Sequence, residues 1–198
     1  MSKWGVMLTR AQPFHMGHLY MIKEILNEND EVLLLIGSAN KVRTKRNPLS
    51  IKTRMKQVKK AIQYYLPLDE GRIKVVPLDD WSMENYSPAV KEWGNFLYYS
   101  IVFNIGVKSF NFYYNDDIST VLDWFVEPLQ ERVNVRTMDR SKIADGVSAT
   151  KVRDLILHSD YNTVMKYMPK TFSLEDFMIV RKVLKQVEKE PKGDFIMK

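Results

Sequence analysis

Short apolar runs alternate with stretches of helical periodicity along most of the chain, and this alternation restricts the fold more than any other feature. The apolar runs span residues 3–9, 31–37, 72–78, 109–114 and 132–137. Strands that are buried on both faces of a parallel sheet have such continuous apolar sequences. Between the runs, apolar residues recur every three or four positions, as they do on one face of an amphipathic helix.

This strand–helix alternation predicts right-handed crossovers and a parallel sheet that is covered by helices on both faces. We expect one helix over about 118–129, and the last third of the chain shows helical spacing without a convincing strand. The fold class is therefore predicted to be α/β, a doubly wound parallel sheet of Rossmann-like type. The predicted domain spans residues 1–198, of which about 148–198 is a helical C-terminal extension. In such folds the ligand crevice lies beyond the carboxyl ends of the strands.

The composition indicates a soluble globular protein with an anionic partner, since the formal net charge is +6 and the pI is about 9.3. The chain has no cysteine, which excludes disulfides and thiolate metal sites. No apolar stretch approaches the roughly 20 residues that a bilayer span needs. Because the first residues also lack the plan of a signal peptide, we expect no membrane contact and a cytoplasmic location.

Basic residues are concentrated between Val32 and Leu68, a segment without any acidic residue. They are Lys41, Arg43, Lys45, Arg46, Lys52, Arg54, Lys56, Lys59 and Lys60. We interpret most of this run as the solvated face of a helix that follows a cap at Ser50, together with the loop before it. Nucleic acid is not the expected partner, because the aromatic residues are not interleaved with the run as a stacking platform requires.

The stretch "TRAQPFHMGH" follows the first apolar run and contains two of the three histidines of the chain, His15 and His18. It leads into a helix, whose first N–H groups and positive dipole favour phosphate. Gly17 leaves room for a phosphate to approach the backbone. The imidazoles and Arg10 can donate hydrogen bonds to phosphoryl oxygens. A metal site is a weaker interpretation, since the two histidines have no third ligand of the usual kind nearby.

A second polar segment, "VSATKVR" (residues 147–153), also leads into a predicted helix and carries groups that can bind phosphate. Ser148 is suited to cap a helix, and Arg153 lies one helical turn beyond Thr150 on the same side. Hydroxyls, free amides and a guanidinium at one helix start would hold a polyphosphate. We expect this segment and the Arg10–His18 segment to converge on one triphosphate.

"RAQPFHMGH" resembles the H-x-G-H signature of the nucleotidylyltransferase superfamily, and its form R-x-Q-P-F-H-x-G-H resembles the archaeal-type nicotinamide-nucleotide (NMN) adenylyltransferases. Further matches follow in order: "IGSAN", "RNPLSIKTRM", "VSATKVR" and a Met-Pro-Lys stretch at 168–170. The resemblance thus covers nearly the whole chain. It implies a nucleotidyltransferase fold and an enzyme of NAD biosynthesis that transfers the adenylyl group of ATP to NMN, giving NAD and pyrophosphate.

The resemblance also implies roles for individual residues. His15, His18, Arg10 and Arg153 would be catalytic, and Gly17, Arg46, Ser148 and Thr150 would bind ATP phosphates. NMN would be bound by Asp80, Trp81, Trp93 and Asn115, with a tryptophan stacked on the pyridinium ring. Mg²⁺ is expected as the cofactor, held mainly by phosphates and not by a protein cage. Relatives of this kind are often homo-oligomers.

Several positions depart from the family pattern: Thr9 replaces a glycine, Asn40 a glutamine and Thr53 a glutamate, and the approach to the second signature is longer. None of them removes a predicted phosphate ligand, but they leave the identity of the second substrate open. The sequence does not decide whether nicotinic acid mononucleotide is accepted as well as NMN. One alternative is another small-molecule adenylyl- or cytidylyltransferase of the superfamily. Another is a catalytically idle regulatory protein that binds nucleotide or NAD. Such a protein would be expected to have lost residues of one of the two signatures, and both are intact here.

Overall fold

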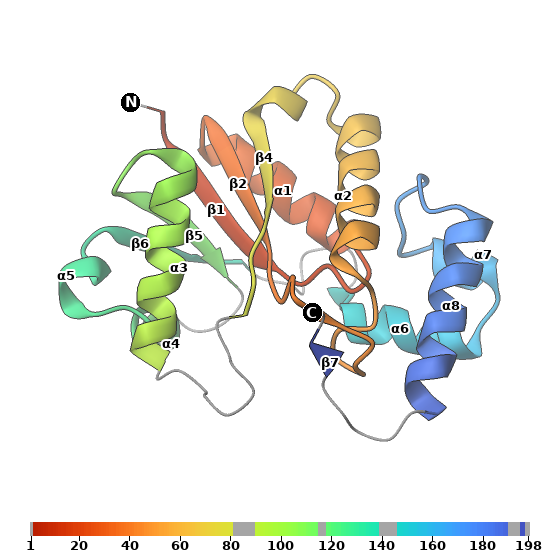
Figure 1. Ribbon diagram of the computed structural model, residues 1–198. Helices are drawn as coiled ribbons and strands as arrows, with labels where there is room; N and C mark the ends of the chain where they lie inside the picture. Colours follow the sequence, from red (N-terminus) through yellow and green to blue (C-terminus); the bar gives the residue numbers. More distant parts are fainter. Residues whose placement is uncertain (1, 81–89, 115–117, 139–145, 190–194, 197–198) are drawn as a thin grey trace.

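The computed structural model describes residues 2–80, 90–114, 118–138, 146–189 and 195–196. Its centre is a five-stranded parallel sheet with the order β4-β2-β1-β5-β6 (Figure 1). The strands are β1 (Trp4–Thr9), β2 (Glu31–Ile36), β4 (Ile73–Pro77), β5 (Phe110–Tyr114) and β6 (Val133–Thr137). Each lies within one residue of the run predicted for it at either end.

The strand order reverses between β1 and β5. From β1 the chain builds outward through β2 to the edge strand β4, and then crosses to β5 on the other side of β1. The register places Gly5 opposite Asn111 and Met7 opposite Tyr113. The carboxyl ends of β1 and β5 therefore lie side by side where the strand order reverses, which is where doubly wound folds bind ligands.

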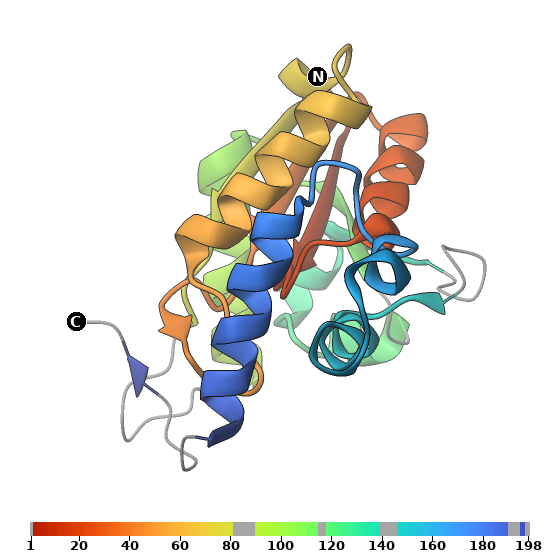
Figure 2. The same ribbon diagram turned by 90° about the vertical axis from the view of Figure 1, so that its right-hand side faces the viewer.

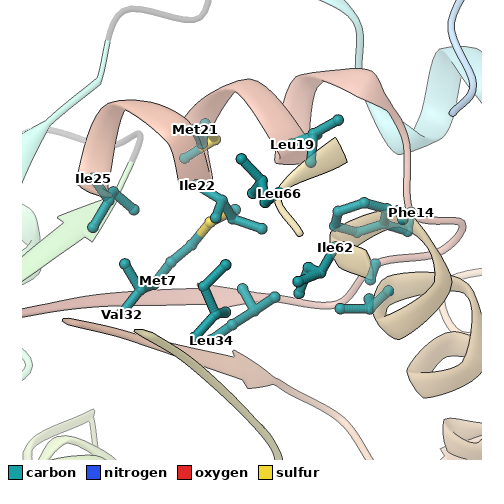
Figure 3. Close-up of a cluster of buried hydrophobic side chains, with 14 of the residues drawn as sticks. Met7, Phe14, Leu19, Met21, Ile22, Ile25, Val32, Leu34, Ile62 and Leu66 are labelled. Carbon is teal, nitrogen blue, oxygen red and sulfur yellow. The ribbon is translucent and has the colours of Figure 1, made fainter. Parts of the chain in front are cut away.

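Helices cover both faces of the sheet, and each face has its own apolar core. One face carries α1 (Met16–Glu28) and α2 (Ile51–Tyr65), and the other carries α3 (Val90–Ile105), α4 (Ile118–Leu122) and α5 (Glu127–Gln130). Figure 3 shows the first core, in which Met7 and Leu34 of the sheet meet Ile22 and Ile62. Val6 and Leu33 point into the other core. Burial on both sides explains the continuous apolar runs of the sequence.

The C-terminal part of the chain is helical, as predicted, and has a third apolar core. It consists of α6 (Ala149–His158), α7 (Tyr161–Met165) and α8 (Leu174–Lys189). These helices lie on the side of the sheet beyond α2 in Figure 1, and Figure 2 views them from that side. Two hydrogen bonds from backbone amides attach this part to the rest of the domain. Met16 N donates to the Tyr167 carbonyl at 2.9 Å, and Lys170 N donates to the Tyr65 hydroxyl at 2.9 Å.

Two sequence-based expectations about secondary structure are wrong. The helix expected over 118–129 is divided into α4 and α5, because Pro128 lies in the first turn of α5 and cannot continue a helix from before it. The chain between them packs so closely on α3 that a side chain at Gly94 would overlap the Trp124 carbonyl.

The last third does contain a strand, since β7 (Phe195–Ile196) pairs antiparallel with β3 (Lys41–Val42) in the loop after β2. Two-residue strands carry no periodic signal in sequence, and neither does the short helix η1 (Glu70–Arg72). Within the described ranges, every helix is too short or too polar to span a membrane.

Candidate active site

A pocket of about 210 Å³ opens at the carboxyl ends of β1 and β5. One wall comes from the segment after β1 and includes Arg10, His15 and His18. The opposite wall comes from the start of α6 and includes Ser148 and Arg153. The two segments that the sequence predicts to converge therefore line one cavity, together with Gly17, Thr150 and Tyr114.

The two histidines hold each other at the start of α1. His15 is the N-cap residue, and its Nδ1 accepts a hydrogen bond from Gly17 N at 3.2 Å. His18 Nδ1 accepts from His15 N, also at 3.2 Å. The ring centroids are 3.8 Å apart, and the two residues are buried. Since each Nδ1 is an acceptor, a neutral ring carries its proton on Nε2, the nitrogen that can donate to a phosphate.

Gly17 lies between the His15 ring on one wall and Val147, the residue before Ser148, on the other. A Cβ atom at this position would be 3.0 Å from Nδ1 and Cε1 of His15 and 3.0 Å from Cγ1 of Val147. Contacts this short force a neighbour to move, so any larger residue would displace either the imidazole or the segment before α6. The first N–H groups of α1 already have acceptors, since Met16 N donates to the Tyr167 carbonyl, Gly17 N to His15 Nδ1 and His18 N to the His15 carbonyl. Glycine here therefore keeps the His15 ring and Val147 in place at the positive end of the helix dipole.

The second wall begins at Ser148, which caps α6 by accepting from Lys151 N at 3.2 Å. Arg153 donates through Nη2 to the Thr150 hydroxyl at 3.2 Å and through Nη1 to the Gln12 carbonyl at 2.9 Å. The Gln12 bond joins the start of α6 directly to the loop after β1. Burial lowers the pKa of Arg153, and the nearby charge of Arg10 lowers it further.

The pocket carries positive charge, and the lining residues that the structure describes include no carboxylate. Burial lowers the pKa of Arg10, and Arg46 adds to this effect, whereas Tyr114 and Asp80 oppose it. Arg46 itself is exposed in the loop before α2. Arg10 and Arg153 are thus neighbouring, partly buried cations, and a bound polyphosphate would offset the repulsion between them.

The residues expected to bind NMN are not brought together in the same way. Asp80 follows β4 outside the pocket lining, where Oδ1 accepts from the Ser38 hydroxyl at 3.0 Å and Oδ2 lies 3.2 Å from Lys41 Nζ. Trp93, in the first turn of α3, packs edge-on against Trp124 at 5.4 Å. Trp81 and Asn115 lie outside the described residues.

Arg54 is a functional candidate that sequence reasoning missed. It was counted with the solvated basic run, but its side chain is fully buried. Its Nη1 donates to the carbonyls of Arg10 (2.9 Å) and Gly37 (2.7 Å), and its Nη2 donates to the carbonyl of Ser38 (2.9 Å). Burial lowers its pKa to about 10. The signal in the sequence was its position four residues before Val58, on the apolar face of α2.

Gln12 was also missed, although it belongs to the first motif. Its amide is buried and makes two hydrogen bonds to one residue: Nε2 donates to the Leu49 carbonyl at 3.2 Å, and Oε1 accepts from Leu49 N at 2.9 Å. The Gln12–Pro13 peptide bond is cis. These bonds attach the loop after β1 to the residues that precede α2.

Comparisons with known proteins identify the family of the chain. Residues 6–155 match the cytidylyltransferase-like family. A nicotinamide-nucleotide adenylyltransferase from Saccharolobus solfataricus is 35% identical over 81 residues, covering 41% of this chain and 46% of that protein. One from Halorubrum lacusprofundi is 43% identical over 76 residues, covering 38% and 41%. The matched part of the chain thus spans less than half the length of either relative.

Solved structures share the fold. A bifunctional NMN adenylyltransferase/ADP ribose pyrophosphatase from Francisella tularensis has a TM-score of 0.68 at 22% identity, over 94% of this chain and 51% of that chain. Nicotinic acid mononucleotide adenylyltransferase from Plasmodium falciparum has a TM-score of 0.55 at 10% identity, over 96% and 97%. The family match runs from β1 into α6 and contains both walls of the pocket, and the chain belongs to the cytidylyltransferase-like family.

Proposed function

We propose that the protein transfers the adenylyl group of ATP to the phosphate of NMN, giving NAD and pyrophosphate. The observation that carries this proposal is the convergence of residues 10–18 and 148–153 on one cationic pocket. The two segments contain groups that donate hydrogen bonds to phosphate: the imidazoles, the guanidinium groups, the hydroxyls and the amides at the start of α6. The names of the archaeal relatives support NMN as the acceptor.

The proposed roles follow from where each group lies. His15 and His18 would donate through Nε2 to the phosphates of ATP, with His18 nearest the reacting phosphorus. Ser148, Thr150 and Arg153 would hold the β- and γ-phosphates from the opposite wall. Arg10 and Arg46 would balance the charge that develops on the leaving pyrophosphate.

The proposed chemistry is one in-line displacement without a covalent enzyme intermediate. An oxygen of the acceptor phosphate forms a bond to the α-phosphorus of ATP, and the bond from that phosphorus to the α,β-bridging oxygen breaks. The electron pair of the broken bond leaves with pyrophosphate. The acceptor phosphate is already anionic at neutral pH, so no general base is required. Positioning and electrostatic stabilisation then supply the rate, as in other phosphoryl transfers.

Mg²⁺ is the expected cofactor. The described residues contain no cluster of three or more metal-ligating histidines or carboxylates, and the pocket wall offers mainly cationic and N–H donors. We therefore expect the ion to enter bound to the triphosphate and to be held mainly by its phosphates, with few ligands from the protein. When bound, it would neutralise phosphate charge and orient the triphosphate.

The acceptor end of the proposal rests on fewer contacts. Asp80 would accept a hydrogen bond from the carboxamide of the nicotinamide ring, for which its side chain, 30% exposed, remains accessible. Trp81 or Trp93 would stack on the ring, and Asn115 would bind beside it. A homo-oligomeric state and a cytoplasmic location also remain predictions.

The test is incubation of the protein with ATP, Mg²⁺ and one acceptor at a time, following pyrophosphate and the nucleotide product. The panel comprises NMN, nicotinic acid mononucleotide, phosphopantetheine, flavin mononucleotide and glycerol 3-phosphate. We expect pyrophosphate with NMN, in equal amount to NAD. Pyrophosphate with only a non-pyridine acceptor would assign the chain to another transferase of the family. Absence of pyrophosphate with every acceptor, despite ATP binding, would favour an idle nucleotide-binding protein.

A further inference from the structure

Arg54 lies in α2 beneath the point where β1 and β2 separate, and α2 packs over β2 and β4 (Figure 1). The last ladder bond between the two strands runs from Gly37 N to the Thr9 carbonyl, at 2.9 Å. Beyond that bond the carbonyls of Arg10, Gly37 and Ser38 all accept from the guanidinium of Arg54. One planar group therefore replaces the missing ladder.

We propose that Arg54 is a positioning residue that holds the phosphate-binding loop after β1 in a fixed relation to the acceptor-side loop after β2. What the two loops bind rests on the function proposed above. The positioning itself rests on the hydrogen bonds of Arg54 and on its complete burial.

The backbone on both sides of the fork adopts a conformation that needs support. Ala11, the residue after Arg10, has φ 49°, and Ser38 has φ 50°. Residues with a side chain rarely occupy this left-handed region, so surrounding bonds must hold them there. Arg54 binds the carbonyl directly before Ala11 and the carbonyl of Ser38 itself.

The carbonyls bound by Arg54 belong to residues of the proposed site or to their direct neighbours. On one side, Arg10 lines the pocket, and the Gln12 carbonyl two residues later accepts from Arg153. On the other side, the Ser38 hydroxyl donates to Asp80 at 3.0 Å, and Ala39 N donates to the Leu78 carbonyl at 3.0 Å. The proposed ATP-binding and acceptor-binding residues are thus connected through a single guanidinium.

A lysine cannot reproduce this connection, because its ammonium is a point donor and not a flat fork. Arg54→Lys therefore tests the proposal while keeping the charge. The matched control is Arg72→Lys, since Arg72 also donates to three carbonyls, those of Asp30 (2.7 Å), Leu26 (3.2 Å) and Asn29 (2.8 Å). Arg72 directly precedes β4 and lies at the opposite, amino-terminal end of the strands.

The measurements are ATP affinity by calorimetry and kcat and KM for both substrates, at a temperature where circular dichroism shows each variant folded. We expect both variants to lose stability. Only Arg54→Lys should weaken ATP binding about tenfold, lower kcat about tenfold or more, and raise the acceptor KM, because small misplacements of reacting groups are costly. ATP affinity and kinetics within twofold of wild type, or an equal loss in Arg72→Lys, would overturn the proposal.

If Arg54→Lys does not fold, the acceptor KM of Ser38→Ala tests the connection between the two loops. This variant keeps the Ser38 carbonyl but removes the bond to Asp80. We expect a rise of about fivefold in the acceptor KM with ATP affinity unchanged, consistent with the loss of one hydrogen bond. An unchanged acceptor KM would contradict the connection between the two loops. If wild-type protein used no acceptor at all, the proposed function would fail, whereas ATP affinity in Arg54→Lys, compared with Arg72→Lys, would still test the positioning.

Discussion

The guanidinium of Arg153 donates a 2.9 Å hydrogen bond to the backbone carbonyl of Gln12, 141 positions earlier in the chain. This bond joins α6, which begins in the second sequence motif, to the loop that forms the first. Arg153 thus contributes both a positive charge to the pocket and a direct link between its walls. Two motifs that are far apart in sequence form one site because the fold places both beside the carboxyl end of β1.

Replacing Arg153 with alanine should weaken ATP binding by about tenfold to a hundredfold, since it removes a charge-assisted phosphate donor and the link to Gln12. Calorimetric titration with ATP measures this effect. Arg181→Ala is the matched control, because Arg181 also donates to one backbone carbonyl, that of Leu157 at 2.9 Å, but lies outside the pocket lining. Equal ATP affinities for the two variants would show that Arg153 does not contact the triphosphate.

His18→Ala should leave the fold intact and lower turnover by at least about a hundredfold, equivalent to about 2.7 kcal/mol of transition-state stabilisation. The loss of the bond from His15 N should cost about 1 kcal/mol of the free energy of unfolding, as for other helix caps. Steady-state pyrophosphate release and urea denaturation separate the two effects. His158→Ala, at an exposed position of α6, should change neither. Near-wild-type turnover in His18→Ala would remove His18 from the reaction.

Gly17→Ala should weaken ATP binding about tenfold, since the added methyl group displaces either the His15 ring or Val147. Alanine is the better helix former by about 1 kcal/mol, which offsets the cost of the close contacts with His15 and Val147. The free energy of unfolding should therefore change little. The matched control is Gly71→Ala, where a Cβ atom would meet nothing within 4 Å. Unchanged ATP affinity in Gly17→Ala would mean that the phosphates do not approach this backbone.

Tyr113 should make stability sensitive to alkaline pH. Burial raises its pKa to about 12, and its hydroxyl donates to Glu28 at 2.7 Å and accepts from Asn29 at 2.8 Å. A group whose pKa is raised on folding stabilises the protein fully below the unfolded value, near 10, and loses that contribution as the pH rises through the folded value. The stability advantage of wild type over Tyr113→Phe should therefore narrow between pH 10 and 12. A constant difference across that range would contradict the raised pKa.

Most of the sheet could be predicted from sequence because a buried parallel strand has a continuous apolar signature. All five strands were located this way, and the caps at Ser50 and Ser148 were identified from the helix starts. The residues proposed to bind phosphate could be identified from sequence because phosphate recognition commonly uses a local pattern at helix starts. The structure brings His15, His18, Arg10 and Arg153 into one pocket as expected.

The missed features depend on contacts between segments far apart in sequence. Arg54 reads as one more basic residue of a polar helix until its carbonyl partners on two other segments are known. The His15–His18 pair was predicted as a phosphate ligand, but its mutual capping of α1 was not, since capping depends on ring orientation. The residues proposed to bind the acceptor have no such local pattern, because Asp80 follows β4 and Trp93 lies in α3, and the two share no motif.

A crystal structure with Mg²⁺ and α,β-methylene ATP, which cannot release pyrophosphate, tests the convergence of the two walls most directly. We predict that the triphosphate lies between them, within hydrogen-bonding distance of the His15 or His18 imidazole on one side and of Ser148, Thr150 or Arg153 on the other. A nucleotide bound elsewhere, or in contact with only one wall, would contradict nucleotidyl transfer at this site.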